Sequence, residues 1–147
     1  MSEATTFEHQ LRVPYAWTDA QARVFYANYL LVADEARYAF WEHGLGLGAT
    51  GVRDIEHSFF VVHIECDYHG AAEFYDLLDT SVQPSDLGRS SLRLAYRIGK
   101  ADSGELVFTA SSVIVWADQA SGRPAPWPDN VRDALLSRYG DSILKTG

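Results

Sequence analysis

The side chain best placed for chemistry in this sequence is Asp19, which lies between two contrasting patterns. An alternating apolar and polar run precedes it, and a long apolar stretch with helical spacing follows it. The first N–H groups of a helix have no partner within the helix and lie at the positive end of its dipole. They can polarise a bound carbonyl while the Asp19 carboxylate attacks that carbonyl or activates a water. On composition alone, an acid at this position is more often a helix cap or a solvated turn residue.

The elements that would position Asp19 are a strand and a helix. Residues 7–17 alternate between apolar and polar side chains, which predicts a half-buried strand. Residues 27–43 repeat apolar side chains at helical spacing, and Asn28 is expected to be the N-cap. The apolar stripe extends almost around this helix, so we expect the helix to be wrapped on most sides. Glycines between positions 44 and 51 then predict its end and a loop.

The rest of the chain is mostly β in pattern. Four strands separated by short turns are predicted at residues 56–68, 76–84, 90–100 and 105–118. The first of these contains a near-continuous apolar run, which is typical of a central strand. Pro128 introduces a short helix that reaches about Tyr139. Consecutive strands with short connections predict an antiparallel sheet, and the long helix must cover its apolar face.

The order of elements predicts one α+β domain over residues 1–147, with no linker or internal repeat. The expected sheet has two faces and two edges. One long helix cannot shield all of them from solvent, so we expect a homodimer.

Composition and charge exclude several classes of function. The chain has 12 basic and 20 acidic residues and a net charge of −8, which argues against nonspecific nucleic-acid binding. A few local arginines could still hold a phosphorylated small molecule. The lone Cys66 rules out an intramolecular disulfide and suits a reducing cytosol, where we expect it to pack as a small core residue. The N-terminus has no signal-peptide pattern and no apolar run is long enough to span a membrane, so a soluble cytoplasmic protein is expected.

Four segments of the chain carry a further pattern. Residues 18–29 read TDAQARVFYANY, residues 66–76 read CDYHGAAEFYD, residues 88–91 read GRSS, and residues 122–124 read GRP. In this order they resemble the hotdog-fold thioesterases of the 4-hydroxybenzoyl-CoA thioesterase type. The opening signature of that family is Asp-Thr-Asp-x-x-Gly-x-Val-Tyr/Phe-x-x-x-Tyr. The resemblance spans about residues 8–135.

The resemblance implies a hotdog fold, in which an antiparallel sheet of about five strands wraps around one long central helix. It also implies subunits with joined sheets, as a homodimer or homotetramer. The implied substrate is an acyl-CoA thioester, with aryl-CoA esters among the candidates, or an acyl-carrier-protein thioester. The implied reaction is hydrolysis, without a metal or redox cofactor. A non-catalytic acyl-CoA-binding module on the same fold is the alternative from a different class.

The resemblance also assigns roles to individual residues. Asp19 takes the position of the catalytic carboxylate, either as nucleophile or as general base. Tyr26 takes the position whose backbone N–H binds the thioester oxygen. The residues expected near the CoA nucleotide are Arg89, Ser90, Ser91 and Arg123.

Three positions near this signature need a separate account. Ala22 replaces the glycine of the family, so a left-handed backbone there would cost about 1–2 kcal/mol, or the loop must differ. Arg23 is a candidate for orienting the substrate. Arg37 falls on the buried stripe of the helix, where an unpaired cation is costly. It is therefore expected either to form an ion pair with Glu35, Asp34 or a partner strand, or to lie near a carboxylate, hydroxyl or carbonyl of the substrate.

An arginine cluster is predicted on one strand. Arg89, Arg93 and Arg97 share one parity, so they are expected to project from the same face of the sheet. Such a cluster suits CoA phosphates, but a solvated face paired with acids is an equal alternative. Arg89 and Ser90 are the stronger candidates because they lie in the turn.

Overall fold

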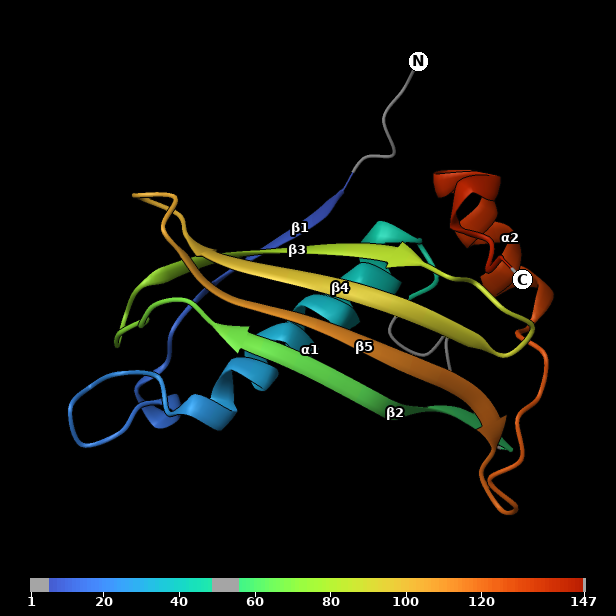
Figure 1. Cartoon of the computed structure of the whole chain (residues 1–147), viewed down its shortest axis with the longest axis horizontal. Coiled ribbons are helices and arrows are strands. Elements are labelled where there is room, and N and C mark those ends of the chain that lie inside the picture. The colour runs from blue at the N-terminus through green and yellow to red at the C-terminus, as the bar shows by residue number, and fades with distance from the viewer. Residues whose placement is uncertain (1–5, 49–55, 147) are drawn as a thin grey trace.

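One antiparallel sheet carries one long helix along its inner face (Figure 1). The structure is a computed structural model and describes residues 6–48 and 56–146. Its principal elements are β1 (Phe7–Arg12), α1 (Tyr29–Ala39), β2 (His57–Tyr68), β3 (Leu77–Ser85), β4 (Ser91–Lys100), β5 (Leu106–Asp118) and α2 (Asp129–Tyr139). Within the described residues the strands form one five-stranded antiparallel sheet in the order β1-β3-β4-β5-β2. This architecture confirms the predicted α+β hotdog fold.

The core forms because the helix and the strands present apolar side chains at their own periods. On β4, the alternate residues Leu92, Leu94, Tyr96 and Ile98 are buried, and the residues between them are half-buried or exposed. On α1, Val32 and Ala36 are fully buried. Burial of a Leu, Ile or Val side chain contributes about 1.5–3 kcal/mol. The alternation on β4 therefore fixes which face of the strand meets the helix.

The first strand is shorter than the alternating pattern predicts. β1 ends at Arg12, and Tyr15–Trp17 forms a 3-10 turn after Pro14. Proline has no N–H to donate to a strand ladder, and its fixed φ suits the entry to a turn. The chain therefore leaves the sheet several residues before Asp19.

The start of the helix also differs from the prediction. A 3-10 turn, Tyr26–Asn28, precedes α1, and a π-helical turn, Phe40–Gly44, follows it. Asn28 is the N-cap residue of α1, but its side chain makes no capping hydrogen bond. Its Nδ2 instead donates to the carbonyl of Trp17 at 3.0 Å. Asn28 thus ties the helix start to the preceding segment rather than capping the helix.

β2 is an edge strand, not the central strand that its apolar run indicates. Within the described residues it pairs with β5 alone. Phe60, Val61, Val62 and Ile64 each expose between 41% and 59% of their surface. A register shift between Val61 and His63 marks a β-bulge at Val62. An uncovered apolar edge of this kind is a surface that monomeric proteins rarely leave open.

Two further expectations have opposite outcomes. The terminal helix is confirmed as α2, which follows Pro128 and ends at Gly140, where φ is 76° and glycine is favoured. Cys66, expected in the core, is instead exposed, since it lies on the edge strand. None of the helices in residues 6–48 and 56–146 is long and apolar enough to cross a membrane.

Candidate active site

Asp19 lies in a tight loop that its own carboxylate helps to hold. Thr18 and Val24 form an antiparallel bridge across the loop, and the Asp19 N–H donates to the carbonyl of Arg23 at 2.8 Å. Oδ1 of Asp19 accepts hydrogen bonds from the N–H groups of Gln21 (2.8 Å) and Arg23 (3.3 Å). Among the described residues no hydrogen bond engages Oδ2. One oxygen therefore orients the carboxylate, and the other is open to a substrate or a water.

The loop requires a left-handed backbone at Ala22, where φ is 60°. The Ala22 N–H donates to the Asp19 carbonyl at 2.9 Å, and the Ala22 carbonyl accepts from the Phe74 N–H at 2.7 Å. These bonds hold the strained residue in place. The loop therefore keeps the conformation for which the family uses glycine, at a cost of about 1–2 kcal/mol.

The helix start lies directly after this loop. Trp17 offers its carbonyl to the Phe25 N–H at 3.0 Å as well as to Asn28 Nδ2. Tyr26 is the first residue of the 3-10 turn, so its N–H has no acceptor within that turn. The Tyr68 hydroxyl donates to the Tyr26 carbonyl at 2.8 Å, which joins the helix start to the end of β2. Partial burial and the neighbouring Cys66 raise the pKa of Tyr68, so this hydroxyl stays protonated at neutral pH.

Arg23 lies at the outer side of the same loop and is exposed. It forms an antiparallel bridge with Glu73, and the Val24 N–H next to it donates to Ala72 at 2.8 Å. Its backbone therefore anchors the loop to the segment that precedes β3. Its role in orienting a substrate stays a prediction.

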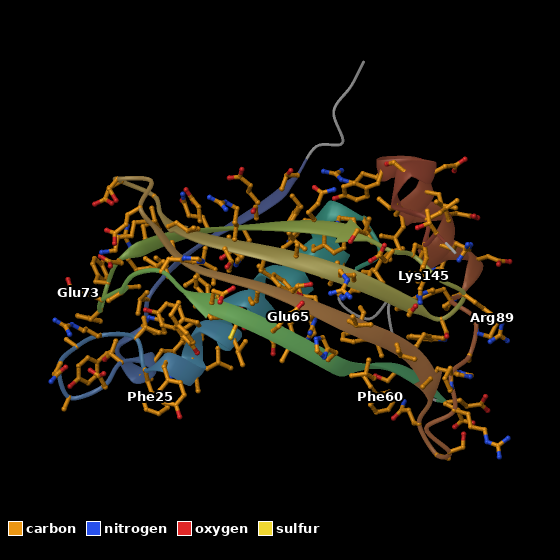
Figure 2. All side chains as sticks on the ribbon, viewed as in Figure 1. Phe25, Phe60, Glu65, Glu73, Arg89 and Lys145 are labelled. Atoms are coloured by element: carbon orange, nitrogen blue, oxygen red, sulfur yellow. The ribbon has the colours of Figure 1, made fainter. Side chains whose placement is uncertain are left out.

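The predicted CoA-binding residues lie at the opposite end of the molecule. Figure 2 shows Phe25 at the loop end, and Arg89 with Lys145 at the far end. The loop is anchored beside the start of β3, whereas Arg89 follows the end of β3. The nine residues of β3 separate the two regions by about 30 Å at the rise of a strand. Within one chain, the structure does not bring Asp19 and Arg89 together.

Arg89 belongs to a basic surface pocket of about 560 Å³. Arg132 and Lys145 also line this pocket, and Arg132 Nη1 donates to the Gly88 carbonyl at 3.0 Å. The pattern of the sequence does not reveal either residue, because they lie far from Arg89 along the chain. Asp129 contributes one acid to the rim.

The other residues predicted to bind CoA, Ser90, Ser91 and Arg123, accept backbone hydrogen bonds through their carbonyls. The Ser90 carbonyl accepts from Trp116 and the Ser91 carbonyl from Gly88. The Arg123 carbonyl accepts from the Asp118 N–H at 3.0 Å. Their side chains lie near the end that carries Arg89, and their contact with CoA stays a prediction.

The predicted arginine cluster does not form as one group. Arg89 lies before β4, and Arg93 bonds Asp86 (3.2 Å) and Ser111 (2.8 Å). Arg97 lines a different depression with acidic neighbours, among them Glu8. Of these three arginines, Arg93 is paired with an acid, as the alternative predicts, and only Arg89 lies in a basic pocket and remains a candidate for binding phosphate.

Arg37 confirms the predicted ion pair and has further polar neighbours. Its side chain is only 8% exposed, and Nη2 contacts Asp34 Oδ1 at 3.1 Å. The guanidinium lies 4.9 Å from the centre of the Phe59 ring. Burial raises the pKa of the nearby Tyr96 hydroxyl, although the Arg37 cation and hydrogen bonds with Ser112 and Arg37 oppose the rise. Arg37, Ser112 of β5 and the buried Tyr96 line a pocket of about 220 Å³ between α1 and β2.

Together the sheet, the central helix and the carboxylate loop at the helix start define a hotdog-fold protein. The family model of the thioesterase-like superfamily matches residues 13–135, so the chain belongs to that superfamily.

Individual relatives support the same placement. A 1,4-dihydroxy-2-naphthoyl-CoA hydrolase of Synechococcus elongatus is 26% identical over 138 residues, which is 88% of this chain and 94% of the relative. The solved 1,4-dihydroxy-2-naphthoyl-CoA thioesterase of Synechocystis has a TM-score of 0.80 at 22% identity, covering 90% of this chain and 96% of that chain. The gentisyl-coenzyme A thioesterase BH1999 has a TM-score of 0.76 at 27% identity, covering 86% of this chain and 99% of that chain.

Replacing Ala22 with glycine should stabilise the protein, because glycine adopts a positive φ without the Cβ clash. We expect a gain of about 1 kcal/mol, or a melting temperature higher by about 2–4 °C. Ala20→Gly is the matched control in the same exposed loop, where φ is not positive, and it should lower stability. Thermal unfolding followed by circular dichroism measures both changes. A loss of stability in Ala22→Gly would contradict the strained loop.

The Asp19 carboxylate should contribute to stability through its hydrogen-bonding oxygen rather than through its charge. Asp19→Ala removes the acceptor for two backbone N–H groups and should cost about 1–2 kcal/mol. Asp19→Asn keeps an equivalent oxygen and should stay within about 0.5 kcal/mol of the parent protein. Urea unfolding followed by tryptophan fluorescence compares the two variants. Equal losses would show that the loop bonds do not hold Asp19.

Proposed function

We propose that this protein hydrolyses a CoA thioester, with aryl-CoA esters as the favoured class. The observation that carries the proposal is the Asp19 carboxylate, whose Oδ1 is fixed by the loop and whose Oδ2 is open. The loop leads directly into the 3-10 turn that begins at Tyr26. Relatives named for naphthoyl-CoA and gentisyl-CoA support the aryl class. A solved relative in complex with CoA, with a TM-score of 0.81, has the same fold.

In the proposed reaction the Tyr26 N–H donates to the carbonyl oxygen of the thioester. Negative charge develops on that oxygen as a nucleophile adds to the carbon, and a preorganised N–H stabilises it. If Asp19 is the nucleophile, Oδ2 forms an acyl anhydride, the C–S bond breaks and CoA leaves as the thiolate. Water then opens the anhydride. If Asp19 is the base, it takes a proton from water, the hydroxide adds to the carbonyl, and collapse of the adduct expels the thiolate.

A homodimer would bring the two distant halves of the site together. A two-fold axis that pairs β2 with β2 of a second copy in antiparallel fashion continues the sheet and covers its apolar edge. In that pairing the Tyr68 end of one β2 meets the His57 end of the other. The Asp19 loop of one subunit would then face the end of its partner that carries Arg89 (Figure 2). Arg123 lies at that end too, since its carbonyl accepts from Asp118, which is opposite His57. Arg132 and Lys145 would add to the grip on the CoA phosphates.

Turnover tests the catalytic role of Asp19. Asp19→Asn should lower kcat with aryl-CoA esters by about 100-fold or more, because the amide is neither a nucleophile nor a base. Thiol release from a panel of acyl- and aryl-CoA esters measures this. Asp102→Asn, in the β4–β5 turn, is the matched control and should keep full activity. Near-normal turnover in Asp19→Asn would remove Asp19 from the mechanism, and no turnover of any ester would refute the proposed activity.

The mass of the protein in solution tests the dimer. Light scattering should give at least twice the 16.4 kDa of one chain. Val62→Glu places a charge at the middle of β2, where two copies would face each other, and should shift the mass towards the monomer. Ala95→Glu, exposed on central β4, is the control and should stay dimeric. A monomeric mass for the unmodified protein would contradict the composite site.

A further inference from the structure

One side chain of the edge strand β2 holds the backbone at the start of the helix. Tyr68 is the last residue of β2, and the end of this strand lies beside the start of α1 (Figure 1). The Tyr68 hydroxyl donates to the Tyr26 carbonyl at 2.8 Å. That carbonyl belongs to the peptide directly after the N–H proposed to bind the thioester oxygen. A contact between distant parts of the chain therefore bears on the orientation of the proposed oxyanion donor.

The side chain of Tyr26 does not anchor its own backbone. Tyr26 exposes 65% of its surface, and its ring packs on that of Phe25, which is also exposed. The 3-10 turn Tyr26–Asn28 has three residues, and the ends of helices fray readily. Because the Tyr26 N–H must stay free to meet a substrate, the Tyr26 carbonyl is the polar group through which this backbone can be held in place.

Tyr68 is itself held firmly. Its ring packs edge-on against Tyr29 at 5.6 Å and Phe108 at 5.1 Å, and these two buried rings stack on each other. The backbone of Tyr68 lies opposite Phe108 in the ladder with β5, and the next residue, His69, donates its N–H to the Val107 carbonyl at 2.9 Å. Ring packing and the sheet together fix the phenol, so its hydroxyl is preorganised to meet the Tyr26 carbonyl.

The Tyr68 hydroxyl also remains a donor at neutral pH. A phenol donates from its protonated form, and burial together with the neighbouring Cys66 raises the pKa of Tyr68. A hydrogen bond accepted by a peptide carbonyl polarises the N–H of the same peptide, which here is the N–H of Ala27. Ala27 follows Tyr26 in the turn, so this polarisation adds positive charge beside the Tyr26 N–H. Negative charge that develops on a thioester oxygen there is stabilised further.

We propose that Tyr68 is a positioning residue for thioester hydrolysis, because its hydroxyl keeps the Tyr26 N–H aimed at the thioester oxygen. The inference rests on the proposed function, and it adds a residue of β2 that acts through the backbone without touching the substrate. An interaction that strengthens only as charge develops raises kcat, whereas uniform binding lowers KM. The Tyr68 hydroxyl should therefore affect kcat and leave substrate binding nearly unchanged.

Turnover by full-length Tyr68→Phe protein tests the proposal, because this change removes the hydroxyl and keeps the ring. Removing one oxyanion donor costs roughly 100- to 1,000-fold in kcat, and loss of its support alone should cost less. We expect kcat with benzoyl-CoA and the other esters of the panel to fall about tenfold, since a misplaced donor stabilises the transition state poorly. KM should change by less than about twofold. Thiol release measures both constants.

Binding of benzoyl-CoA separates a positioning role from a general structural one. Asp19→Asn protein and the double variant Asp19→Asn, Tyr68→Phe should bind this ester with Kd values within about twofold of each other. Retained binding also shows that the double variant is folded.

Two further variants show whether the hydrogen-bond donor is responsible. Tyr15→Phe is the matched control, because Tyr15 is exposed at the same end of the molecule and its hydroxyl bonds none of the residues that the structure describes. Its kcat should stay within about twofold of the parent value. Tyr68→4-aminophenylalanine places an N–H donor where the O–H was, and it should restore kcat to within about threefold of the parent value.

The amide proton of Ala27 reports on the same hydrogen bond without turnover. In Tyr68→Phe its NMR signal should move upfield, since the carbonyl of its own peptide loses a hydrogen bond. The signal should keep its position in Tyr15→Phe.

The inference is overturned by a loss of kcat below about twofold in Tyr68→Phe, by a loss of substrate binding that matches the loss of kcat, by failure of 4-aminophenylalanine to restore activity, or by an unmoved Ala27 signal. Each of these outcomes leaves the proposed function standing when the parent protein hydrolyses an ester. No turnover by the parent protein with any ester refutes the proposed function, and the role of Tyr68 in the reaction with it.

Discussion

The packing of α1 against the inner face of a single sheet determines both ends of the site. Because Val32 and Ala36 are buried against the sheet, the helix can neither rotate nor slide without exposing them. Its first turn is then held beside the Asp19 loop by the Trp17 carbonyl and the Tyr68 hydroxyl. Its third turn places Arg37 beneath β2. One buried helix thus sets where a carbonyl could be polarised and where its acyl group could extend.

The same packing leaves a part of the molecule incomplete. One helix covers the middle of the sheet but not the edge of β2, where Val61 and Val62 are about half exposed. The basic pocket around Arg89 lies at the far end from the carboxylate loop. A second copy that continues the sheet would solve both problems together. The strained Ala22 fits this account as well, because backbone strain of this kind persists at functional sites when surrounding bonds fix the conformation.

Local patterns predicted the elements well where burial alone decides the structure. The alternation on β4 and the stripe on α1 match the observed burial, since each depends only on the period of the element. The first strand was predicted too long because the alternation continued past Pro14, which ends the ladder. β2 was predicted to be central because an apolar run reports only that side chains avoid water. It cannot distinguish burial within the chain from burial by a second chain.

The candidate site was predictable in part. The place of Asp19 ahead of the helix and the Arg37–Asp34 pair follow from short-range order, and the structure places both as expected. The roles of Asp19 and Tyr26 came from the family resemblance and stay predictions. Ser112 and Lys145 could not be found in this way. Ser112 is brought to its pocket by the register of the sheet, and Lys145 is brought beside Arg89 because the end of the chain folds back against that turn. Both are contacts between residues far apart in the sequence.

The central claim is that Asp19 of one subunit acts with Arg89 of its partner. Asp19→Asn and Arg89→Glu proteins, each assayed alone below the KM, should both hydrolyse an aryl-CoA ester poorly. After the two are unfolded together and refolded, each mixed dimer contains one site with both native residues. The account predicts that the mixture recovers a substantial fraction of the parent activity. Activity no higher than the average of the two separate variants, in a mixture shown to contain mixed dimers, would contradict it.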